Sequence, residues 1–104
     1  MAGLLVVEPG RDWAASGGLF EWTLDFLMRR LTVPEAVEHL RDIAEHNLGS
    51  LWLSELSAEA RAQALAQLRD HLVEAGEREL PDGPRKAAVI DQLRQLADLA
   101  DHAG

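Results

Sequence analysis

Cysteine and tyrosine are absent from this 104-residue chain, and only two phenylalanines and three tryptophans are present. Without cysteine the protein has no disulfide bond, no thiolate nucleophile and no cysteine-ligated zinc site. The apolar run at residues 4–7 is far too short for the core of a signal peptide or for a membrane span. We therefore expect a cytoplasmic protein that is stabilised by its hydrophobic core alone.

Basic residues are also scarce, with ten lysines and arginines against eighteen acidic residues and a formal charge of −8. This balance repels phosphate backbones and anionic lipid surfaces, so we expect neither a nucleic-acid nor a membrane partner. Lys86 is the single lysine beside nine arginines. Together with the high alanine content, this usage is typical of a GC-rich genome and favours a bacterial source.

Leucine and alanine are abundant, with eighteen and sixteen copies, and both favour helix because they lose little side-chain freedom there. The chain length suits one domain with one core. We expect an all-α fold, a compact bundle of about four helices that is either antiparallel or irregular and orthogonal. Residues 18–104 form this helical domain, and residues 1–17 form an extended N-terminal arm.

Local signals place the four helices. The first is predicted over residues 18–31, beginning at Ser16 or Gly17. The second begins at Thr32, which forms a capping box with Glu35, and ends near Gly49. The third begins at the N-cap Ser57 and stops at Gly76. The fourth runs from about residue 84 to residue 100, with Pro84 in its first turn.

Two segments do not fit regular helices. Residues 4–7 have strand-like composition but no evident sheet to join, so we expect them to pack across the helices or onto a partner after a turn at Pro9 and Gly10. Residues 50–56 are too apolar for a solvated loop and too short for a long helix. We expect one or two helical turns there, which favours the irregular arrangement.

The sequence contains no nucleophile with an adjacent base and no phosphate-binding glycine loop. His39, Asp42 and His46 share a helical face, but the two histidines are about 10 Å apart along the axis, too far to bind one ion. An enzyme would need a carboxylate pair such as Glu38 and Asp42 beside a cavity. We expect no catalytic residue, no metal, no cofactor and no enzymatic activity.

Two groups of residues suit protein binding. The acidic helix face with Glu38, Asp42 and Glu45 could pair with a basic surface. Tryptophan is enriched at binding hot spots, although core packing is its commoner use. We expect a small acidic protein-binding module that acts as an inhibitor, an immunity-type protein or an adaptor, and the alternative is a self-associating structural dimer without catalytic activity. The tryptophans with a predicted binding role are Trp13, Trp22 and Trp52.

Overall fold

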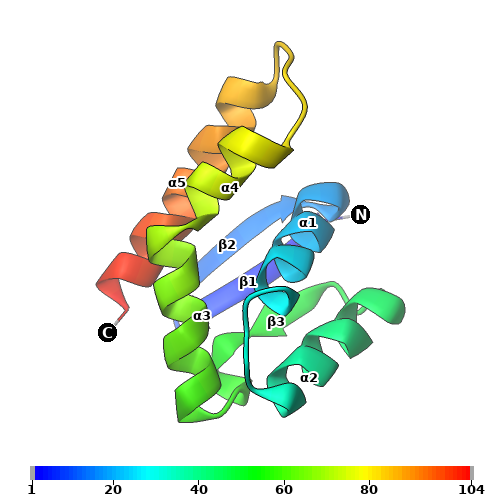
Figure 1. Cartoon of the computed structure of the whole chain (residues 1–104), viewed down its shortest axis with the longest axis vertical. Coiled ribbons are helices and arrows are strands. Elements are labelled where there is room, and N and C mark those ends of the chain that lie inside the picture. The colour runs from blue at the N-terminus through cyan, green and yellow to red at the C-terminus, as the bar shows by residue number, and fades with distance from the viewer. Residues whose placement is uncertain (1, 104) are drawn as a thin grey trace.

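The computed structural model describes residues 2–103 and contains both helices and a three-stranded sheet (Figure 1). The prediction of an all-α bundle is therefore wrong. The elements in chain order are β1 (Ala2–Glu8), β2 (Arg11–Ser16), α1 (Gly17–Met28), α2 (Pro34–Glu45), β3 (Ser50–Trp52), the 3-10 turn η1 (Leu53–Glu55), α3 (Ala58–Asp70), α4 (Leu72–Glu79) and α5 (Lys86–His102).

The sheet has the strand order β2-β1-β3. Strands β1 and β2 form an antiparallel hairpin whose turn is Pro9 and Gly10, and Gly10 takes a φ of 85°, a value that suits glycine. Strand β3 pairs with β1 in parallel. The expected extended arm is thus a hairpin that supplies the central strand β1 and the edge strand β2 of the sheet. Residues 4–7 do have a sheet to join, because β3 comes from a distant part of the chain.

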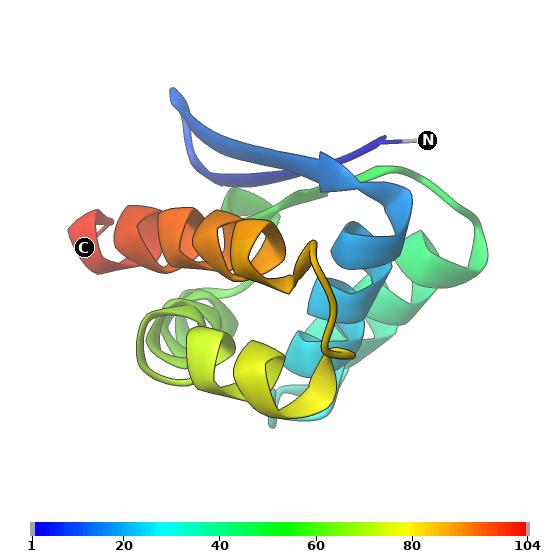
Figure 2. The same ribbon diagram turned by 90° about the horizontal axis from the view of Figure 1, so that it is seen from above.

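All five α-helices lie on one side of the sheet (Figure 2). The strand side chains that face them are buried, and they join the helices in one core. Cross-strand register places Leu5 opposite both Trp13 and Leu51 on this inner face. Gly3 lies there too, where an added Cβ would come within 3 Å of the Phe20 ring. The buried inward-facing residues are Gly3, Leu5, Val7, Trp13, Ala15 and Leu51.

Two of the predicted helix starts are confirmed. The Ser16 hydroxyl accepts a hydrogen bond from the Leu19 amide at the start of α1, and the Ser57 hydroxyl accepts one from the Ala60 amide at the start of α3. Each bond satisfies a backbone N–H that has no partner inside its helix.

The predicted capping box at Thr32 is wrong. Helix α2 begins at Pro34, and its N-cap Val33 makes no side-chain cap. Thr32 instead bonds to Gln63 of α3, which accepts from the Thr32 amide at 3.0 Å and donates to the Thr32 hydroxyl at 2.7 Å. At the other end of α2, Asn47 takes the left-handed conformation, with a φ of 54°, and the Leu48 amide donates to the Ile43 carbonyl. This is a Schellman-type end formed by Asn47 rather than by the expected Gly49.

The predicted third helix is two helices, α3 and α4, which break at His71. Gly76 lies inside α4 and does not stop it. The reason is tertiary: a Cβ at Gly76 would lie 2.4 Å from a methyl group of Leu93 on α5, so glycine permits close packing of the two helices. Helix α5 runs back beside α3 and α4 (Figure 1). It begins at Lys86, two residues after the predicted Pro84.

The apolar connector also differs from prediction, because residues 50–52 form strand β3 and only residues 53–55 form a helical turn. Leu51 and Leu53 are fully buried. The strand completes the sheet, and the turn leads the chain to the helical layer.

Side-chain bonds also link elements that are distant in the sequence. The Trp13 indole N–H donates to the Gln92 carbonyl at 2.8 Å and holds β2 against α5. Arg29, at the end of α1, donates to the Glu79 carboxylate of α4 at 2.8 Å. This hydrogen bond lowers the pKa of Glu79 and raises that of Arg29. Among residues 2–103, no helix has the length and apolar character that crossing a membrane requires.

Candidate functional site

The three tryptophans have different surroundings. Trp13 is 4% exposed and belongs to the core. Trp22 is half-buried on α1, where its ring stacks on Phe26 with centroids 5.9 Å apart. Trp52 is 42% exposed at the end of β3. Of the three tryptophans with a predicted binding role, Trp52 is the most exposed.

The acidic face of α2 is solvated and partly neutralised. Glu38 pairs with Arg41, and the Asp42 carboxylate lies 3.0 Å from Nδ1 of His46. Glu45 is exposed, and no cation lies within ion-pair distance of it in the described part of the chain. These three carboxylates lie on one helix, and they do not line the hollow beside it that includes Glu35 and His39.

The histidines of α2 are not brought together. His46 is exposed and contacts Asp42, whereas His39 is half-buried, and its Nε2 atom is inaccessible and makes no hydrogen bond. Across residues 2–103, no group of three or more histidine, aspartate or glutamate side chains is arranged to hold a metal ion.

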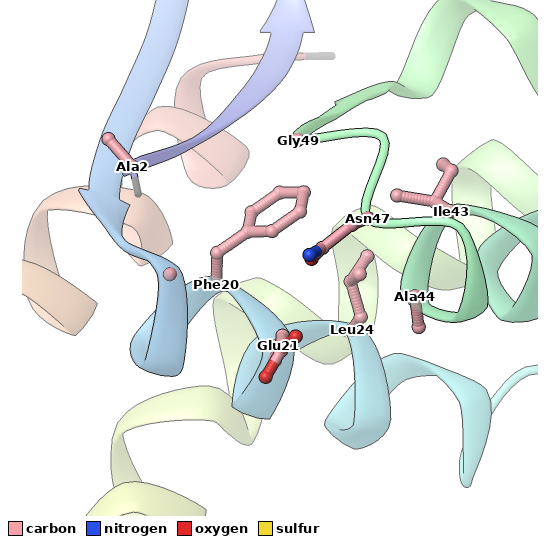
Figure 3. Close-up of a pocket in the computed structure, with 9 residues that line it drawn as sticks. Ala2, Phe20, Glu21, Leu24, Ile43, Ala44, Asn47 and Gly49 are labelled. Atoms are coloured by element: carbon pink, nitrogen blue, oxygen red, sulfur yellow. The ribbon is translucent and has the colours of Figure 1, made fainter.

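The cavity between α1, α2 and the start of β1 is too small for a substrate (Figure 3). Its volume is about 30 Å³, space for one or two water molecules. The Phe20 ring and the Asn47 side chain point toward each other across it, while the Glu21 carboxylate points away (Figure 3). A single carboxylate without an acid or base beside it has no partner for proton transfer.

Within residues 2–103, no helix covers the outer face of the sheet (Figure 2). Alternation along the strands and the cross-strand register define it: Leu4 lies opposite Ala14 and Ser50, and Val6 lies opposite Asp12 and Trp52. We call this surface the open face, and its residues are Ala2, Leu4, Val6, Asp12, Ala14, Ser16, Ser50 and Trp52.

The open face is mostly apolar. Leu4 is half-buried and Ala14 is exposed, while Val6 is only 5% exposed between its cross-strand neighbours Asp12 and Trp52. The large hydrophobic side chains that are exposed within residues 2–103 are Trp52 and Leu48, at 42% and 57%. Both belong to β3 or to the loop that leads into it. Of these two side chains, Trp52 is the one that lies on the open face.

On the rest of the surface, most basic side chains form ion pairs, whereas many acidic side chains do not. Within the described residues, eight of the ten lysines and arginines lie within 4 Å of a carboxylate. Within the same residues, ten of the eighteen acidic side chains have no lysine or arginine within 4 Å, and one of these ten, Asp42, contacts His46. The field around the molecule is therefore negative, which attracts basic proteins and raises their association rate.

The sequence pattern singled out Trp52 and did not single out the other residues of the open face. Asp12, Leu4 and Val6 become neighbours of Trp52 only when β3 joins β1. The local signal that was present is the alternation in β2, where Trp13 and Ala15 are buried and Asp12, Ala14 and Ser16 are exposed. Comparison with protein-family models, with curated proteins and with solved structures gives no match for this chain.

Proposed function

We propose that this chain is a non-catalytic protein-binding module that docks onto a basic surface of another protein through the open face. It acts as an inhibitor, an immunity-type protein or an adaptor, and its working compartment is the cytoplasm. The observation that carries the proposal is the exposure of Trp52 on a sheet face that no helix covers.

Two further features support this function. Tryptophan often provides much of the binding energy in protein interfaces, because water is excluded around a large, rigid side chain. The net charge of −8 and the unpaired carboxylates favour a basic partner, whose approach they accelerate.

Self-association is the second candidate function, and the composition of the open face favours it. Asp12 is its single charged side chain, so two copies could stack these faces with little repulsion at the contact. The sheet would then be covered on both sides in the dimer, as in a two-layer sheet packing.

A pull-down of the tagged protein from its native cytoplasm, at low and at moderate salt, tests the proposal. We expect one basic partner that is retained at low salt, weakened by added salt and lost with Trp52→Ala. Gln95→Ala, an exposed change on α5, is the matched control and should retain the partner.

Two results would reject the proposal. In the first, the pull-down recovers no other protein, the wild type has the mass of a dimer in solution, and Trp52→Ala has the mass of a monomer. This result would favour self-association. Capture that is identical for Trp52→Ala and the wild type would exclude the open face as the interface.

A further inference from the structure

The open face carries a hollow of about 400 Å³ between Trp52 and the tip of the β1–β2 hairpin. Leu4 and Val6 form its apolar floor. Its remaining lining residues are Pro9, Gly10, Asp12 and Trp52. The hollow therefore combines an aromatic ring, a carboxylate and an apolar base in one concave surface.

The register places the ring and the carboxylate on opposite sides of the hollow. Val6 on the central strand pairs with Asp12 on β2 and with Trp52 on β3. Because adjacent strands are about 4.8 Å apart, the backbones of the two outer residues are separated by about 10 Å. That distance leaves room for one planar group to contact both side chains.

The protein's own cations do not occupy this position. Arg11 is next to Asp12 in the sequence, but its guanidinium pairs with Glu8 at 2.8 Å. Arg61 approaches the same Glu8 carboxylate at 3.9 Å. Asp12 is exposed, and no cation lies within 4 Å of its carboxylate in the described part of the chain. The hollow thus has one uncompensated negative charge.

We propose that this hollow receives an arginine side chain of the partner protein. A guanidinium is planar and weakly hydrated, so it can stack on the Trp52 indole while it donates hydrogen bonds to the Asp12 carboxylate. The apolar floor accommodates the methylene stem of the arginine. The open face around the hollow is then covered by neighbouring residues of the same partner.

This inference rests on the proposed function and names the chemistry by which the partner is recognised. It also explains how a single carboxylate gives specificity on an apolar face. A neutral partner would bury Asp12 without compensation, which costs binding energy, whereas a correctly placed arginine pairs with it.

The test is a titration of the 15N-labelled full chain with Nα-acetyl-arginine methylamide, followed by NMR. The control ligand is Nα-acetyl-citrulline methylamide, which has nearly the same shape and no charge. We expect saturable shifts of the Trp52 indole N–H and of the Val6 and Asp12 amides with the arginine ligand only. The Trp13 indole N–H, which is bonded to Gln92, should not move.

Two variants distinguish binding of arginine in the hollow from non-specific attraction of a cation to the acidic surface. Asp12→Asn should weaken arginine binding roughly five-fold, the size expected for one solvent-exposed ion pair. Asp91→Asn removes an exposed carboxylate from α5 and should leave binding unchanged. An unshifted Trp13 indole signal in each variant shows that the fold is intact.

The results separate this inference from the proposed function. Equal shifts with citrulline, or unchanged arginine binding by Asp12→Asn, would overturn the arginine site even if Trp52→Ala abolishes partner capture. In the converse result, the arginine ligand alone shifts the NMR signals of the hollow while Trp52→Ala still captures the partner. That result would support a cation site and reject the open face as the partner interface.

Discussion

The two faces of the sheet are formed by the same strands, and both contain apolar side chains. On the inner face, Leu5 and Trp13 are covered by helices and lose nearly all contact with water. On the open face, Leu4 and Trp52 have similar chemistry but remain half-buried or exposed. The difference lies in the covering layer, because all five α-helices lie on one side of the sheet.

An apolar run in a sequence does not show by itself which of its residues form the core. Residues 4–7 are apolar throughout, yet alternation assigns Leu5 and Val7 to the helices and Leu4 and Val6 to the open face. A strand with two apolar faces normally lies between two layers. Residues 2–103 provide no second layer over the open face, and the proposed function rests on this difference.

The largest expected effect comes from truncating neighbouring residues on opposite faces. Leu5→Ala removes a fully buried side chain and should lower the free energy of unfolding by about 2–5 kcal/mol. Leu4→Ala on the open face is the matched control, with an expected loss of less than about 1 kcal/mol. Urea denaturation measures both values. Equal losses would show that the open face is as well packed as the inner one.

Trp13→Phe tests the inner face at its link to the helices. The variant loses the hydrogen bond to the Gln92 carbonyl and part of the buried ring, so we expect a loss of about 1–3 kcal/mol in thermal or urea unfolding. Trp22→Phe, at a half-buried position, should lose less. A larger loss for Trp22→Phe would contradict the core role assigned to Trp13.

Trp52→Ala should separate binding from stability. Because Trp52 is 42% exposed, its removal should change the free energy of unfolding by no more than about 1 kcal/mol, while partner capture is lost. Far-UV circular dichroism and urea denaturation provide the stability measurement. Collapse of the fold would instead make Trp52 a structural residue of the sheet.

The smallest effect concerns the ion pair between Arg29 and Glu79 in the helical layer. The hydrogen bond from Arg29 lowers the pKa of Glu79 in the folded protein. Its stabilisation is therefore present above the ordinary glutamate pKa and is lost as the pH falls through the lowered folded value. Glu79→Gln should slightly reduce stability near neutral pH and should equal the wild type in strong acid.

Unfolding of both proteins by urea at about pH 7 and at about pH 2.5 measures this difference. Glu74→Gln is a suitable control, because Glu74 pairs with Arg78 within α4 only. If the difference between wild type and Glu79→Gln is the same at both pH values, the link between α1 and α4 contributes through packing and not through charge.

Features that depend on a few adjacent residues were predictable. Ser16 and Ser57 cap helices because each hydroxyl reaches an amide three residues ahead, and the Pro9–Gly10 turn requires only local conformation. Thr32 and Gly76 misled the prediction because distant residues decide their roles: Gln63 bonds to Thr32, and Leu93 packs against Gly76. Local patterns cannot encode such contacts.

The candidate site also combines a feature that the sequence could indicate with neighbours that only distant contacts bring together. Trp52 could be named from the sequence, because tryptophan in a short connector suggests an interface. Its neighbours could not be named, because Asp12 and Val6 approach Trp52 only through sheet pairing. Trp13 looked equivalent to Trp52 in the sequence, and only its place on the inner face made it a core residue.

Composition and contacts within one helical turn account for the acidic surface, the absence of disulfide bonds and the high helix content. Tertiary structure decided that residues 2–16 form a hairpin, that residues 50–52 complete a parallel pairing with it, and which strand face stays open. The pairing of β1 with β3 joins residues far apart in the chain. Its outcome depends on which distant segments meet, and no local pattern records that choice.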